Sequence, residues 1–110
     1  MSDTSEHKIA EIVFPFDKPL LYEYMEDNKI QQCMLHKHVT VSRRDCQEDI
    51  WVIEVGSGSV LNKNGAIEFE PSNQTDDFIQ RTRFSYDDAI KETQSMFAKC
   101  VEYPMPTEQE

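Results

Sequence analysis

The stretch IWVIEVGSGSVLNKNGAIEFE, residues 50–70, carries the clearest strand signals in the chain. Residues 50–55 are rich in branched and aromatic side chains, which favour strands, and every second side chain points to the same side. Shorter strands are expected at 59–61 and 66–70. They flank Asn64-Gly65, a pair typical of hairpin turns because both residues tolerate positive φ. This stretch therefore predicts antiparallel β-structure.

Upstream of this stretch, strands are expected at about 9–16, 20–25 and 30–42. Pro15 cannot donate a hydrogen bond to a neighbouring strand, so the first strand should lie at a sheet edge or a bulge. Residues 20–25 also fit a helix, but the polar turn after them and the extended pattern that follows favour a hairpin. In the strand 30–42, the alternation favours Cys33, Leu35, Val39 and Val41 as the core face.

Downstream, Ser85 precedes an apolar pattern with helical spacing and predicts a helix over about 86–102. Its hydroxyl can accept a hydrogen bond from the amide of Asp88, and acids in the first turn suit the helix dipole. Residues 76–84 are expected to form a short structure, with 80–84 a candidate edge strand. Glu54, which alternates away from the apolar side of its strand, is expected to be solvated.

The predicted fold class is therefore α+β, with an antiparallel sheet of about four to six strands and one C-terminal helix packed on one of its faces. A single domain is expected over 9–103. The polar N-terminus, 1–8, and the acidic tail, 104–110, are expected to be disordered.

Composition narrows the class of function. The chain has 110 residues, 21 acids, 11 bases and a net charge of −10. No basic stripe, membrane-length apolar run or secretory signal is present, so neither nucleic-acid binding nor a membrane segment is expected. Three cysteines, Cys33, Cys46 and Cys100, fit reduced thiols better than a disulfide framework. These features predict a cytoplasmic protein. No motif predicts an enzyme or a cofactor, and the oligomeric state stays open.

Two histidines are the candidate metal or small-ligand residues. His36 and His38 share one face of a strand, about 6.5–7 Å apart along it. Zinc and similar metals need a third and usually a fourth ligand, and no acid with suitable spacing follows. The simpler interpretation is a solvated sheet face that carries two imidazoles.

Arg81 and Arg83 alternate on the expected strand 80–84 and are candidates for binding an anion. Acids lie just upstream, at 76–77, and just downstream, at 87–88. The alternative is that these charges pair locally, which contributes little to stability in water.

The acids near the two ends carry most of the excess charge. Residues 86–110 hold six acids and two bases, and residues 1–30 hold seven acids and three bases. Asp87, Asp88, Glu92 and Glu102 are expected on the helix and are the candidate partner-binding residues. A negative surface steers association with a basic partner, although such a surface also simply keeps a protein soluble.

In size, sign of charge and order of elements, the chain resembles small acidic accessory proteins of bacteria and phages, such as toxin-immunity proteins and inhibitors of host machinery. The net charge of −10, the pattern of reduced cysteines and the lack of a catalytic motif predict a non-catalytic module, an inhibitor or accessory protein, that binds a basic protein surface. Two alternatives are a mimic of DNA charge that inhibits a nucleic-acid-binding protein, and a metal- or small-ligand-binding protein that uses His36 and His38.

Overall fold

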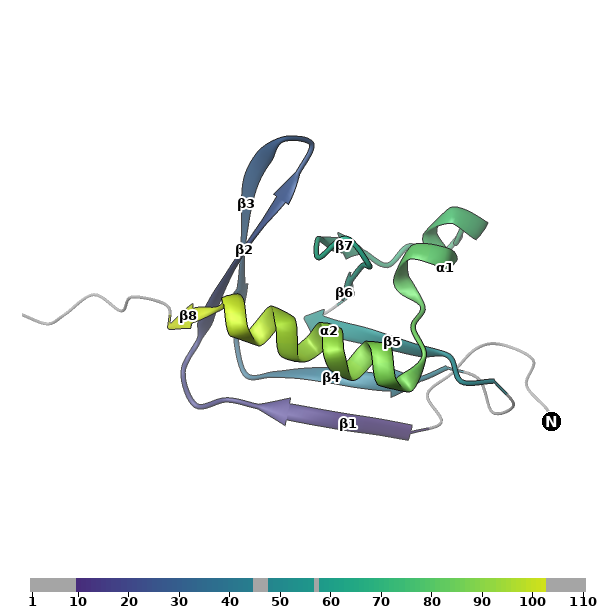
Figure 1. Cartoon of the computed structure of the whole chain (residues 1–110), viewed down its shortest axis with the longest axis horizontal. Helices are drawn as coiled ribbons and strands as arrows, with labels where there is room; N and C mark the ends of the chain where they lie inside the picture. The colour runs from purple at the N-terminus through teal and green to yellow at the C-terminus, as the bar shows by residue number, and fades with distance from the viewer. Residues whose placement is uncertain (1–9, 45–47, 57, 103–110) are drawn as a thin grey trace, which may run out of the picture.

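The computed structural model describes residues 10–44, 48–56 and 58–102 (Figure 1). The predicted disordered ends, 1–8 and 104–110, lie outside these residues. In chain order the elements are β1 (Ala10–Pro15), β2 (Leu20–Glu26), β3 (Lys29–Leu35), β4 (His38–Arg43), β5 (Trp51–Gly56), β6 (Ser59–Leu61), β7 (Ile67–Phe69), α1 (Asp76–Thr82), α2 (Tyr86–Lys99) and β8 (Val101–Glu102). The chain is thus α+β, as predicted.

The strands form two antiparallel sheets, so the prediction of a single sheet is wrong. Five strands lie in the order β1-β4-β5-β6-β7, and three lie in the order β3-β2-β8. The predicted strand 30–42 divides at His36–Lys37, where the chain bends and passes from the small sheet to the large one. The amide of Phe16 donates to the carbonyl of Lys37 at 3.0 Å and fixes this corner.

The N-terminal strand and the first hairpin are formed as predicted. β1 is an edge strand, and Pro15, its last residue, lies opposite His38. Residues 20–25 are a strand, not a helix, and β2 pairs with β3 throughout its length. The two-residue turn between them is Asp27-Asn28, with φ of 54° and 63°. Positive φ at both positions matches the right-handed twist of the two strands.

One face of the large sheet contributes to the main hydrophobic core. The predicted core side chains Leu35, Val39 and Val41 are fully buried there, and Cys33 packs against the same cluster. Ala89 and Met96 of α2 belong to the cluster as well. In Figure 1, α2 runs alongside β4 and β5.

On its other face, the large sheet contributes to a second cluster, in which Val52 and Val60 meet Phe78 of α1. The candidate strand 80–84 is wrong, because most of this segment belongs to α1. Thr75 starts the helix by accepting a hydrogen bond from the amide of Phe78 at 3.1 Å. After the helix, Phe84 forms an isolated antiparallel bridge with Trp51.

The second helix starts as predicted and ends earlier. The hydroxyl of Ser85 accepts from the amide of Asp88 at 3.2 Å. The helix ends at Lys99 because Cys100 adopts an extended conformation, with ψ of 151°. Val101 and Glu102 then pair with the start of β2 as strand β8. The predicted end of the helix at 102 is therefore wrong, since the last two residues complete the small sheet.

A side-chain hydrogen bond connects the two sheets. Tyr22 of β2 is 2% exposed, and its hydroxyl donates to the carbonyl of Gly65, in the loop between β6 and β7. Gly65 has a φ of 84°, and an added Cβ would lie 3.3 Å from the Tyr22 oxygen. A side chain at position 65 would therefore strain the backbone and crowd this bond.

The substitution Tyr22→Phe tests this connection. It removes the hydroxyl and leaves the half-buried carbonyl of Gly65 without its donor, so we expect a loss of about 1–2 kcal/mol in the free energy of unfolding. Urea denaturation followed by tryptophan fluorescence measures the change. Tyr86→Phe is the control, because this ring is 39% exposed, and a surface change of this kind costs less than about 0.5 kcal/mol. Equal losses in the two variants would contradict the assigned role of Tyr22.

Candidate functional site

The four predicted partner-binding acids lie at different places in the fold. Asp87 and Asp88 are exposed in the first turn of α2, and Glu92 is half-buried in its middle. Glu102 lies on β8 rather than on the helix, where Lys18 approaches it at 3.9 Å on the surface. The 14 residues of α2 span about 20 Å, which separates the first two acids from the last. The acids therefore do not form a single helix face.

The two candidate anion-binding arginines contact carboxylates of this chain. Arg81, in the last turn of α1, binds Glu68 of β7 through two hydrogen bonds of 2.7 and 2.8 Å. These bonds hold the pKa of Glu68 below its usual range. Arg83 is buried and lies 3.6 Å from Glu70. The sequence predicted that nearby aspartates would be their partners. In the structure the partners are glutamates, Glu68 of β7 for Arg81 and Glu70, just after β7, for Arg83.

A largely buried ionic cluster surrounds Arg44. Its guanidinium lies 2.6 Å from Glu54 of β5 and 3.1 Å from Glu70, and the three side chains are 11, 19 and 17% exposed. Ser42 also donates to Glu54 at 2.9 Å. Burial lowers the pKa of Arg44, but the hydrogen bonds with Glu70 and Glu54 outweigh this effect and raise it. The expectation that Glu54 is solvated is therefore wrong.

The sequence contained a signal for this cluster. On β5, the side chain of Val52 points to the same side as Glu54, and it is fully buried. A strand that is apolar on both sides is covered on both faces. A carboxylate within such a strand needs a cationic partner, because burying an unpaired charge costs several kcal/mol.

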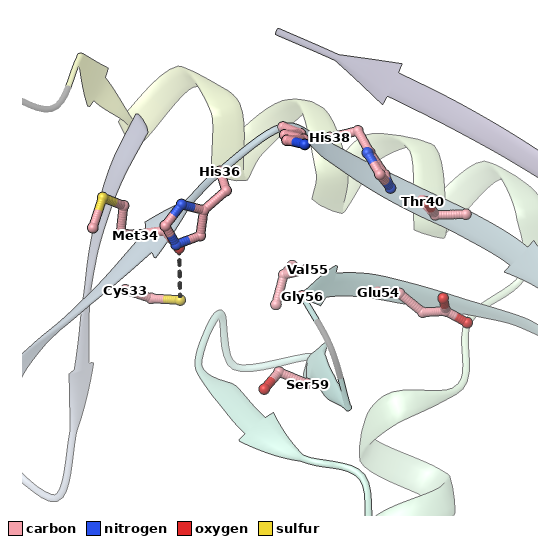
Figure 2. A pocket seen from close by; sticks show the side chains of 10 residues that line it. Cys33, Met34, His36, His38, Thr40, Glu54, Val55, Gly56 and Ser59 are labelled. Atoms are coloured by element: carbon pink, nitrogen blue, oxygen red, sulfur yellow. Dashed lines mark hydrogen bonds between the residues drawn. The ribbon is translucent and has the colours of Figure 1, made fainter. Parts of the chain in front are cut away.

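The candidate histidines line a groove at the corner between β3 and β4 (Figure 2). Both side chains are exposed. Across the groove from the corner lie residues of β5 and of the start of β6, among them Val55 and Ser59. The volume of the groove is about 500 Å³, within the range of small-molecule sites.

Cys33 lies closer to the histidines than the sequence suggested. Strand alternation placed it on the opposite face, but it lines the same groove, where its thiol contacts the carbonyl of Met34 at 3.9 Å. Burial raises the pKa of this thiol, which disfavours the thiolate that a metal requires. Within the described ranges, no three His, Cys, Asp or Glu side chains are arranged to hold a metal ion.

The outward face of the small sheet exposes apolar side chains in two groups, which the pair Glu23–Gln32 separates. Leu21 lies opposite Met34, Met25 opposite Ile30, and Val101 beside Leu21. Directly paired residues of antiparallel strands share a face. Ile30, Met25 and Val101 are 68, 58 and 57% exposed. We call these five side chains the hairpin face.

Comparing Arg44→Ala with Arg43→Ala tests the buried ionic cluster. Arg44→Ala leaves two buried carboxylates without their common partner, and we expect a loss of about 3 kcal/mol in the free energy of unfolding. Arg43 is the matched control, since it precedes Arg44 directly and makes one exposed hydrogen bond, to the carbonyl of Glu48. Arg43→Ala should cost less than about 1 kcal/mol. Urea denaturation measures both, and similar losses would contradict the cluster's contribution to stability.

The Cys100 thiol should react slowly in the folded protein. Burial, with a smaller effect of Cys33, raises its pKa to about 11. Less thiolate is then present at mildly alkaline pH, so we expect Cys100 to react with iodoacetamide roughly tenfold more slowly in the folded than in the urea-unfolded chain. Peptide mapping by mass spectrometry separates Cys100 from the other cysteines. Equal rates in the two states would contradict the raised pKa.

The described residues thus offer two features that could bind another molecule, the hairpin face and the groove at the β3–β4 corner. No helix among them is long and apolar enough to cross a membrane. Comparison of the chain with protein-family models, with curated proteins and with solved structures finds no match.

Proposed function

We propose that the protein is a small non-catalytic binding module of the cytoplasm that engages a basic protein surface through the hairpin face. The carrying observation is that apolar side chains are exposed together on one face of the sheet β3-β2-β8. Exposed apolar side chains that gather on one face of a soluble protein often mark an interaction site. The β2–β3 hairpin also extends away from the large sheet, which makes its outward face accessible (Figure 1).

The charges around the hairpin face favour a basic partner. Glu23 lies on this face, where it accepts a hydrogen bond from Gln32 at 2.7 Å. Glu26 and Asp27 are exposed at the tip of the hairpin, and Glu102 is exposed on β8. Protein interfaces combine apolar contacts with charged groups, and the sign of the charge selects the partner.

The acids at the start of α2 contribute at longer range in this proposal. Asp87 and Asp88 add to the negative field of the molecule, which accelerates the approach of a basic protein without direct contact. The apolar contacts of the hairpin face then set how long the complex lasts. An inhibitor or an accessory protein of the immunity type works in this way, by covering a surface that its partner needs.

The double substitution Met25→Ser with Ile30→Ser tests the proposal. Both side chains are more than half exposed, so the fold should persist. Removing them should weaken binding of the partner at least about tenfold, because buried apolar side chains at the centre of an interface contribute about 1–2 kcal/mol each. Affinity capture from a lysate of the source organism, followed by calorimetry with the captured protein, measures the loss.

Phe69→Ser is the matched control. Phe69 is 71% exposed and lies on β7 of the large sheet, away from the hairpin face. This variant should bind as the unaltered protein does. Binding should also weaken between ~50 mM and ~500 mM salt, because the surrounding charges are exposed. A partner that is retained by the double variant but lost with Phe69→Ser would place the interface elsewhere.

A further inference from the structure

The bend between β3 and β4 brings three consecutive side chains to one groove. On a straight strand, His36 and His38 would share a face and Lys37 would point to the opposite one. The chain bends at Lys37, and all three residues line the groove at the corner. The hydrogen bond from the amide of Phe16 to the carbonyl of Lys37 holds the bend in place. A local departure from strand geometry thus concentrates groups that can carry positive charge.

No uncompensated acid opposes this charge among the residues that line the groove. Glu54 is the one acid there, and Arg44 and Ser42 bind its carboxylate at 2.6 and 2.9 Å. The surrounding sequence agrees, because the stretch from Lys29 to Arg43 contains three bases, two histidines and no acid. In a chain of net charge −10, this is an unusual concentration of basic residues.

The remaining lining residues suit an organic anion rather than a bare ion. Thr40 and Ser59 carry hydroxyl groups that donate hydrogen bonds to phosphate oxygens. Met34, which is 36% exposed, and the half-buried Cys33 provide apolar surface in the same groove. A volume of about 500 Å³ accommodates a ligand with an apolar body as well as its charged group.

We propose that this groove binds a small organic phosphate, with the phosphate group against His36, Lys37 and His38 and the apolar part against Met34 and Cys33. A dianionic phosphate matches several cationic groups better than a carboxylate does, and lysine is a common phosphate-binding residue. The site shares Met34 with the hairpin face, but its three basic residues lie outside that face. The proposal therefore does not depend on a protein partner.

Phenyl phosphate is the probe, and a titration followed by amide NMR spectra at about pH 6 is the experiment. The amides of residues 36–40, 55–56 and 59 should shift together, with saturation by about 10 mM. Inorganic phosphate, which lacks the apolar part, and benzoate, which carries a single charge, should each bind more weakly than phenyl phosphate.

Two variants test which basic side chains bind the phosphate group, and a third variant serves as the control. Lys37→Ala should weaken binding of phenyl phosphate about tenfold, and the pair His36→Gln with His38→Gln should weaken it to a similar extent. These side chains are exposed, and the spectra themselves show whether each variant keeps its fold. Lys91→Ala removes an exposed charge on α2 and should leave the affinity unchanged.

Three results would overturn the proposal. The first is the absence of shifts at residues 36–40 up to about 10 mM phenyl phosphate. The second is an affinity that neither Lys37→Ala nor the double histidine variant lowers. The third is an equal loss with Lys91→Ala, which would show a general effect of net charge. Loss of the protein partner with the hairpin-face variants, while phenyl phosphate still binds them, would separate this site from the proposed function.

Discussion

The architecture depends on the burial of β5 on both of its faces. Its side chains are apolar at every position from 51 to 55 except Glu54, so neither face can be left in water. The main core, to which α2 contributes, covers one face, and Phe78 of α1 helps to cover the other. The remaining carboxylate is compensated by Arg44, which brings the loop after β4 over the same face. The two helices thus help to cover the two faces of β5, and the ionic cluster compensates the charge of its single carboxylate.

Capping residues predict a helix in this chain where a long apolar pattern with helical spacing follows them. Ser85 was recognised as a helix cap because apolar residues with helical spacing follow it. Thr75, followed by two aspartates, carries the same signal, but the helix after it has seven residues and too few turns to show a clear period. The early end of α2 was not predictable from the helix itself, since it follows from the pairing of Val101 with Leu21 of β2, 80 residues earlier.

The candidate sites likewise depend on contacts between residues that are far apart in the sequence. The sequence identified Arg81 and His36, but it could not give their neighbours, because these come from distant strands. Arg81 is bound by Glu68 from β7, and the groove beside His36 has its opposite wall in β5 and β6. The hairpin face was missed for a different reason. Alternation assigned Ile30 and Met34 to the non-core side, but only the existence of a second, small sheet makes that side an exposed apolar surface.

The order of the strands leaves the hairpin that carries the hairpin face outside the large sheet. β1 and β4 are direct neighbours, and the bond from Phe16 to Lys37 closes their pairing, so everything between these residues is an insertion within one hairpin. Tyr22 and Leu35 anchor its base in the core, Tyr24 and Cys33 pack against the same core, and residues 25–32 lie outside both core clusters. The tip of the insertion can therefore change in length and sequence without altering the register of the large sheet. Substitutions and insertions should therefore be tolerated best at this tip.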